Sequence, residues 1–300
     1  MAPVPYRGAI ALVLALIAVP AAAQLVGRPA ARCQSAIGKG GFTFKAKVAS
    51  TSRKCYDALL KGGPCDTAGR DGKIASAADH YGIVMRRSCT PAQLFSAPPA
   101  GLGFALSCAF ESGAPEPAEQ ACAALPVTDA ESLARCLACW KQAELNELLT
   151  IGYPCLVGQI PAGSDLDCGT PPACPVDKLA IDCTRGIAKA ALRFVLAKEQ
   201  ALEKCLNHVI RGRIPGPCPD GKTQALIAAA EAKVTIAALR CNVNPPWWDV
   251  CPEMCSQSIS TLDDIATCIG GSAEAITDEL VCIQYPSAST NGITCPPGDE

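Results

Sequence analysis

The chain has 300 residues, with 26 basic and 28 acidic side chains, 20 cysteines and only two histidines. Aromatic residues make up 5% of the chain, alanine is abundant, and β-branched runs of period two are absent. These features exclude a fold built on sheets and favour closely packed α-helices. The length is sufficient for two domains with hydrophobic cores.

The first 23 residues have the features of a secretory signal peptide. Arg7 supplies a short positive region, residues 9–19 form an uncharged apolar run, and small residues precede a cleavage point after Ala23. The apolar run is too short to span a bilayer comfortably. We therefore expect a secreted or periplasmic protein with no membrane span in its mature form.

All twenty cysteines follow this cleavage point. Cysteines of an exported protein meet an oxidising compartment, so the even number predicts up to ten disulfides. A metal site is the alternative, but only Cys136-x-x-Cys139 and Cys251-x-x-x-Cys255 provide closely spaced thiols, and histidines are few. We expect no metal and no cofactor.

Eight of the cysteines form two matching quartets. Their spacings are 22, 10 and 24 residues in the first quartet and 22, 13 and 23 in the second. The match indicates a duplicated unit. The quartets are Cys33, Cys55, Cys65 and Cys89, and Cys183, Cys205, Cys218 and Cys241.

Each quartet predicts a helical hairpin. A long helix begins at the first cysteine and stops at Gly62 or Gly212, and a second helix covers residues 73–89 or 223–241. Cysteines 22 residues apart on one helix are about 33 Å apart, too far to bond. The hairpins therefore predict the pairs Cys33–Cys89, Cys55–Cys65, Cys183–Cys241 and Cys205–Cys218.

Glycines distinguish the first long helix from the second. Gly38, Gly40 and Gly41 stand where the second helix has Ala188, Ala190 and Ala191. Each glycine costs about 1 kcal/mol relative to alanine inside a helix. We expect the first two turns of the first helix to be looser.

A second repeated block follows each hairpin, because residues 128–154 align without a gap onto 260–286. Thr128-x-x-Glu131 and Ser260-x-x-Asp263 predict capping boxes that start a helix. Each helix should end before a Tyr-Pro pair.

The prolines at 171 and 172 suggest the boundary between two tandem units. The first unit is 24–172, with a hairpin at 33–89 and an acidic helical block at 103–155. The second is 173–300, with a hairpin at 183–241 and an acidic block at 251–286. This division leaves ten cysteines in each unit. We expect an all-α monomer whose units fold independently. Either one disulfide crosses the boundary or, as the even division of cysteines favours, each unit pairs its own.

Charge alternates along the chain. The formal charge is +8 over residues 28–90, −7 over 91–180, +5 over 181–243 and −9 over 244–300. We expect each acidic block to pack on its own basic hairpin. The alternative is that the basic hairpins bind an anionic surface such as lipopolysaccharide. Nucleic acid is not expected, because aromatic residues are not interleaved with the basic ones.

Two short motifs suggest more specific roles. Cys136 and Cys139 have the spacing of a redox pair, but they lie inside a predicted helix without a preceding strand, which favours separate structural disulfides. Trp247 and Trp248 form a weak candidate partner surface, or they cover the open end of the second hairpin. The sequence contains no hydrolase, protease or phosphate-binding motif, and we expect no enzymatic activity.

The second hairpin carries a further pattern of residues, with counterparts in the first hairpin from Cys33 to Cys89: Cys183, Ala188-Lys189-Ala190, Phe194, Lys204-Cys205, Gly216-Pro217-Cys218, Asp220 and Cys241. This pattern resembles a group of uncharacterised secreted, cysteine-rich helical-repeat proteins from Gram-negative soil and marine bacteria. The resemblance implies export, helices and repeats, and it implies no activity and no site residues. Together these features predict a disulfide-rich helical protein with a structural or binding role, whose partner is a protein or a cell surface.

Overall fold

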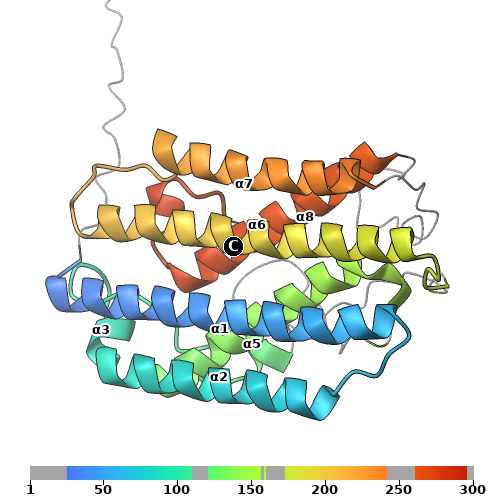
Figure 1. Ribbon diagram of the computed structural model, residues 1–300. Coiled ribbons are helices and arrows are strands. Elements are labelled where there is room, and N and C mark those ends of the chain that lie inside the picture. The colour runs from blue at the N-terminus through green and yellow to red at the C-terminus, as the bar shows by residue number, and fades with distance from the viewer. Residues whose placement is uncertain (1–25, 110–120, 157–158, 160–172, 242–260, 296–300) are drawn as a thin grey trace, which may run out of the picture.

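The computed structural model describes residues 26–109, 121–156, 159, 173–241 and 261–295 (Figure 1). Within these residues the fold is all-α, as predicted. The predicted signal peptide and Trp247 and Trp248 lie outside the described residues. The helices are α1 (Arg28–Leu60), α2 (Thr67–Ser88), α3 (Pro91–Phe95), α5 (Ala130–Gly152), α6 (Lys178–Ile210), α7 (Gly221–Leu239) and α8 (Leu262–Gln284), with short 3-10 helices η1 (Pro154–Leu156) and η3 (Ser289–Asn291).

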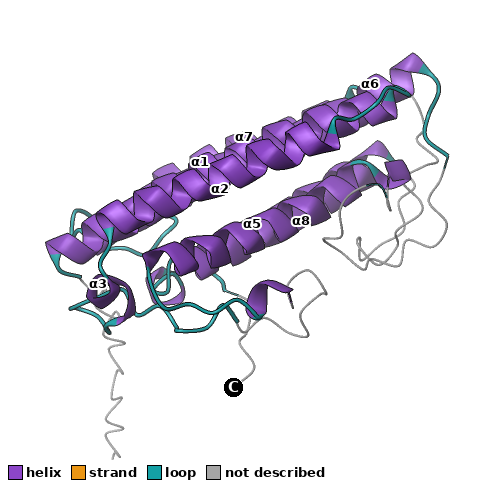
Figure 2. Ribbon diagram, turned by 90° about the horizontal axis from the view of Figure 1, so that it is seen from below, coloured by secondary structure: helices purple, strands orange, loops and turns teal. Residues whose placement is uncertain are grey.

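The helices form two layers. Helices α2, α1, α6 and α7 lie side by side in that order and form the first layer. Helices α5 and α8 form the second layer, which crosses one face of the first (Figures 1 and 2). The two long helices, α1 and α6, run antiparallel at the centre (Figure 1). Each acidic helix packs on its own hairpin, α5 on α1 and α2, and α8 on α6 and α7, as the charge pattern predicts.

Local sequence signals set the ends of the hairpin helices. The Asp66, Asp177 and Asp220 carboxylates accept hydrogen bonds from backbone N–H groups in the first turns of α2, α6 and α7. Gly62 and Gly212 follow the long helices with φ of 75° and 64°, a left-handed conformation in which a side chain would be strained. Both glycine stops were predicted from the sequence.

The capping boxes of α5 and α8 are each one residue later than predicted. Asp129 caps α5 with Ser132, and Thr261 caps α8 with Asp264. Each start contains two adjacent residues able to cap a helix, so the sequence alone did not distinguish the two registers.

The expectation that α1 is loose near its glycines is wrong. The helix is continuous over 33 residues, and Gly38, Gly40 and Gly41 are buried. A Cβ at Gly40 would lie 2.5 Å from the Tyr81 ring, and one at Gly38 would lie 2.6 Å from the Tyr285 hydroxyl. The glycines therefore allow large side chains to approach the α1 backbone closely.

Disulfides close both ends of each hairpin. Cys33–Cys89 and Cys183–Cys241 join the open ends, while Cys55–Cys65 and Cys205–Cys218 join the loop ends, which are the four expected pairs. The other described pairs are Cys108–Cys136, Cys122–Cys139, Cys155–Cys174 and Cys282–Cys295.

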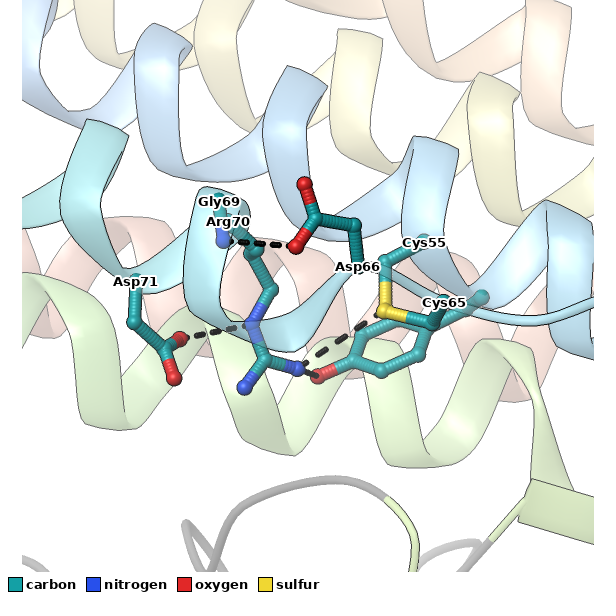
Figure 3. Close-up of a disulfide and its surroundings, with 7 residues drawn as sticks. Cys55, Cys65, Asp66, Gly69, Arg70 and Asp71 are labelled. Carbon is teal, nitrogen blue, oxygen red and sulfur yellow. Dashed lines mark hydrogen bonds and ion pairs between the residues drawn. A yellow bond between two sulfur atoms is a disulfide. The ribbon is translucent and has the colours of Figure 1, made fainter.

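Polar contacts support the first loop end (Figure 3). The Arg70 guanidinium donates to the Asp71 carboxylate at 2.7 Å and to the Tyr56 hydroxyl at 3.4 Å, beside the Cys55–Cys65 disulfide. Asp66 caps the same helix start by accepting from the Gly69 N–H at 2.9 Å. Residues on both sides of the loop thus fix the start of α2 against the end of α1.

One disulfide crosses the predicted boundary, so the alternative that the even division of cysteines disfavoured is the one observed. Cys155 lies in η1 of the first unit, and its partner Cys174 lies beyond the predicted boundary at 172. One core cluster also contains side chains of both units, including Ile37 and Val48 of α1 and Ile187 and Phe194 of α6. The repeats are recognisable, but they share one hydrophobic interior.

Candidate binding grooves on a basic face

Cations line the outer side of the central helix pair. Because α5 and α8 cover one side of α1 and α6, the exposed positions of these two helices lie on the other side of the layer (Figure 2). Among exposed residues of the two helices, Asp182 is the one acid. We define the basic face as Arg32, Lys39, Lys47 and Lys54 of α1 together with Lys189, Arg193 and Lys204 of α6, all exposed.

On the opposite layer, α8 carries five acidic residues and no basic ones. Asp263 and Glu274 of α8 are exposed, and Glu131 of α5 is half-buried. Some of this charge pairs locally: Glu131 accepts from Arg86 at 2.8 Å, and Glu274 lies 3.1 Å from Lys198. Exposed acids also lie on the outer hairpin helices, Asp71 and Asp79 on α2 and Glu231 on α7, so the basic surface is confined to the central helices α1 and α6.

A groove of about 840 Å³ runs between α6 and α7. This volume is within the range of roughly 300–1,000 Å³ that small-molecule sites occupy. Its lining is mainly apolar, with cations among the exposed residues. The apolar residues include Leu179, Ala190, Phe194, Ala197, Ala230, Ile236 and Ala237; the charged ones are Asp182, Lys189, Arg193, Lys233 and Arg240.

The composition of α7 explains why this groove is apolar. The helix buries only Thr223, Ala230, Val234 and Ala238, yet most of its remaining residues are also apolar. Of the six large hydrophobic side chains exposed in the described residues, five lie on α7, at the start of α6 or just before it. They are Val176, Leu179, Leu226, Ile236 and Leu239, with exposed fractions between 47% and 96%.

The first hairpin has a smaller groove at the matching place. It measures about 520 Å³ and is lined by Phe44 and Tyr81 with Lys47, Lys73 and His80 at its edge. The Tyr81 ring stacks against Phe44 at a centroid distance of 6.4 Å, in the space that Gly40 leaves open. A tyrosine therefore fills part of the first groove, whereas the second is lined there by Ala190.

A cluster of charged side chains lies at the centre of the molecule. The Lys141 ammonium donates to the Glu199 carboxylate at 2.6 Å, and Lys45 forms an ion pair with the other oxygen of the same carboxylate. Gln284 donates to Glu203 at 2.5 Å. These five side chains come from four helices, α1, α5, α6 and α8.

Burial perturbs the acid–base behaviour of this cluster. Desolvation lowers the pKa of Lys45 to about 8, although Glu199 opposes the shift. Desolvation and the nearby Glu199 charge raise the pKa of Glu203 to about 7. Burial also acts to raise the pKa of Glu199, but the Lys141 and Lys45 charges outweigh it and lower that pKa overall.

Perturbed groups of this kind often mark active sites, but this cluster is sealed. The exposed fraction is 0% for Lys45 and Glu199, 1% for Lys141 and 6% for Glu203. The ion pairs and hydrogen bonds of the cluster join α1 and α5 of the first unit to α6 and α8 of the second.

The residues that the sequence suggested as chemically reactive do not form a common site in the structure. Cys136 pairs with Cys108, and Cys139 pairs with Cys122, so the alternative of a redox pair is wrong and the expectation of separate partners is confirmed. His80 and His208 are exposed helix residues, as expected. Among the described residues, no group of three or more His, Cys, Asp or Glu side chains could hold a metal.

Neither groove was predicted from the sequence. The composition of α7 could have indicated the larger one, because apolar residues surround the whole helix although only one side packs on α6 and α8. Comparisons with protein families, with curated proteins and with solved structures found no match. Within the described residues, no helix combines the length and apolarity needed to cross a bilayer.

Proposed function

We propose that this is an exported, disulfide-stapled helical protein without enzymatic activity, which binds an anionic lipid surface through its basic face. The observation that carries the proposal is the concentration of cations on the two central helices. Nine exposed cations lie on α1 and α6, namely the seven of the basic face with Arg28 and Lys178, and a single exposed acid accompanies them, while the acidic helix α8 lies on the other layer. Export is proposed from the signal-peptide features and the many disulfides.

The geometry of the face supports binding to a flat surface. On α1, Arg32 and Lys54 are 22 residues apart, which corresponds to about 33 Å along the helix. The two central helices are held side by side by a buried core, so the cations are presented on a rigid layer. Each basic residue near an anionic membrane contributes about 1 kcal/mol to binding.

Sedimentation with lipid vesicles tests this function. We expect the protein to bind vesicles of phosphatidylcholine containing a quarter phosphatidylglycerol, and not vesicles of pure phosphatidylcholine. Added salt should weaken the binding, because exposed charges are screened.

A triple variant locates the surface. Lys39→Gln, Lys47→Gln and Lys54→Gln together should weaken vesicle binding by about a hundredfold, from three contributions of about 1 kcal/mol. Arg87→Gln, Arg211→Gln and Arg213→Gln remove the same charge from exposed positions outside the basic face, and should have a much smaller effect. Equal losses in both variants, or no binding by the unmodified protein, would leave a purely structural role.

A further inference from the structure

We propose that the groove between α6 and α7 binds a linear fatty acid, with the alkyl chain along the groove and the carboxylate held by the cations of its rim. The proposal rests on the proposed function in one respect, because it places the ligand on the basic face. It extends that function from a surface to a defined small-molecule site.

The groove contains apolar side chains that the described structure leaves uncovered. Leu179 and Ile236 line the groove and are 64% and 47% exposed. Contiguous exposed apolar surface of this kind marks an interaction site. An elongated apolar ligand such as an unbranched alkyl chain can lie between the two helices against these side chains and the alanines of the lining.

The register of α6 and α7 brings cations of both helices to the same level of the groove. The Cys183–Cys241 disulfide, with a Cα–Cα distance of 5.2 Å, fixes the start of α6 level with the end of α7. Counting from this bond along antiparallel helices, Lys233 is level with residue 191, between Lys189 and Arg193. Three cations therefore meet at one level of the groove.

This level sets the orientation of the ligand. From Arg193 towards Leu179, the α6 side of the groove extends over 14 residues, or about 21 Å. The lining along this stretch includes Gly186, Ala190 and Ile236. Two charged residues also line it: Asp182, which pairs with Arg185 at 3.1 Å, and Arg240 at the disulfide end. We place the ligand carboxylate at the level of the three cations and direct its alkyl chain towards the Cys183–Cys241 disulfide. The carboxylate then contacts the cations and the chain contacts the apolar lining. Arginine pairs especially well with carboxylates.

The first hairpin provides an internal comparison. Tyr81 fills part of its groove, and its lining includes the polar residues Thr43, Ser50 and Ser76. We therefore assign the fatty acid to the second hairpin alone and expect one site per chain.

Calorimetric titration of the full-length mature protein with laurate, below its micelle concentration, tests the site. We expect saturable one-to-one binding. Each methylene added from octanoate to laurate should strengthen binding by about fourfold, the equivalent of about 0.8 kcal/mol. Dodecanol and dodecyltrimethylammonium, which have the same chain without the anion, should bind at least about tenfold more weakly.

Matched variants place the chain in the groove. Gly186 lines the groove, and an added Cβ there meets no atom within 4 Å. Gly186→Leu therefore introduces a large side chain from an open position and should weaken laurate binding by about tenfold or more. Gly72→Leu is the control, because Gly72 of α2 also meets nothing within 4 Å and lines neither groove. For the carboxylate, Lys233→Gln should weaken binding, whereas Lys222→Gln on the same helix should not.

The outcomes separate this proposal from the proposed function. If vesicles bind but laurate does not, or if Gly186→Leu binds laurate normally, the fatty-acid site is wrong and the surface function stands. If laurate binds as expected but vesicles do not, the surface function is wrong. If the unmodified protein is a dimer that Gly186→Leu converts to a monomer, the groove belongs to a second copy of the chain and the proposal is overturned.

Discussion

Lys141 in α5 and Glu199 in α6 form a hydrogen-bonded ion pair of 2.6 Å that joins the first repeat to the second, with both side chains almost completely removed from solvent. Lys45 of α1 contacts the same carboxylate. A second polar contact crosses between the repeats where Arg185 of α6 lies 3.2 Å from Asp57 of α1. The repeats are therefore joined by buried charge as well as by the shared core.

Replacing Glu199 tests the first contact. Glu199→Gln leaves two buried ammonium groups without their counter-charge, so it should reduce the free energy of unfolding by about 3–5 kcal/mol. Urea denaturation of the oxidised protein measures the change. The control is Glu274→Gln, because the Glu274 carboxylate is half exposed and its partner Lys198 keeps Asp278 at 2.9 Å, so its loss should cost at most about 1 kcal/mol. Equal effects in both variants would contradict a special role for the buried cluster.

The pH dependence of stability should reveal Glu203. Its pKa is raised to about 7 in the folded protein, against about 4.3 for an unperturbed glutamate. Between these two values the folded state binds more protons than the unfolded state, so the contribution of Glu203 to stability is full below about pH 4 and is lost as the pH rises through 7.

Glu203→Gln removes this titration. Unfolding free energies of the variant, measured between pH 4 and 8, should lack the decline that Glu203 gives the unmodified protein. The buried groups around Glu203 are Glu199, Lys141, Lys45, Gln284 and the hydroxyls of Tyr81 and Tyr285. Because none of these is altered, parallel curves for the two proteins would show that Glu203 titrates normally.

Gly40 and Gly72 should respond oppositely to alanine. Gly40→Ala places a Cβ 2.5 Å from the buried Tyr81 ring, and overpacking of this kind costs about 1–3 kcal/mol. Gly72→Ala meets no neighbour and should stabilise α2 by about 0.5–1 kcal/mol through helix propensity. Thermal unfolding of both variants measures the difference, and a stabilising Gly40→Ala would show that Tyr81 can move aside.

The separate halves should fail to fold. The sequence favours two independent units, but residues 24–172 contain Lys45 and Lys141 without Glu199, and they lack the Cys174 partner of Cys155. Each half would also expose the core surface that it shares with the other. Near-ultraviolet circular dichroism and denaturant titration of each fragment, produced under oxidising conditions, measure this. Cooperative unfolding of either fragment would restore the two-domain description.

Local features of the fold were predictable because local physics determines them. The helix stops at Gly62 and Gly212 follow from backbone conformation, and the hairpin disulfides follow from the length of a helix. In contrast, the contacts of Gly40 depend on Tyr81, which lies 41 residues away in a different helix. A helix-propensity scale gives only the loss of helix stability at Gly40. The packing shows that this glycine leaves room for the Tyr81 ring.

The central cluster and the grooves were harder to predict because each depends on several helices. Lys45 and Glu199 occupy core positions of amphipathic helices, and charged residues at such positions indicate buried partners. Their identity could not be read from sequence, since the partners are 154 residues apart. The α6–α7 groove depends on which side of α7 stays uncovered, and this follows from the position of α8.

The central ion pair also determines which halves can associate. Aligning Cys33 with Cys183 places Lys45 opposite Val195 and Ala49 opposite Glu199, so each repeat carries only one member of the pair. Two copies of the second repeat would bury two glutamates with no lysine of α1, and two copies of the first would bury lysines with no acceptor. The two halves are therefore complementary in charge, and a single chain that carries both supplies the lysines and the glutamate in the ratio that the buried cluster needs.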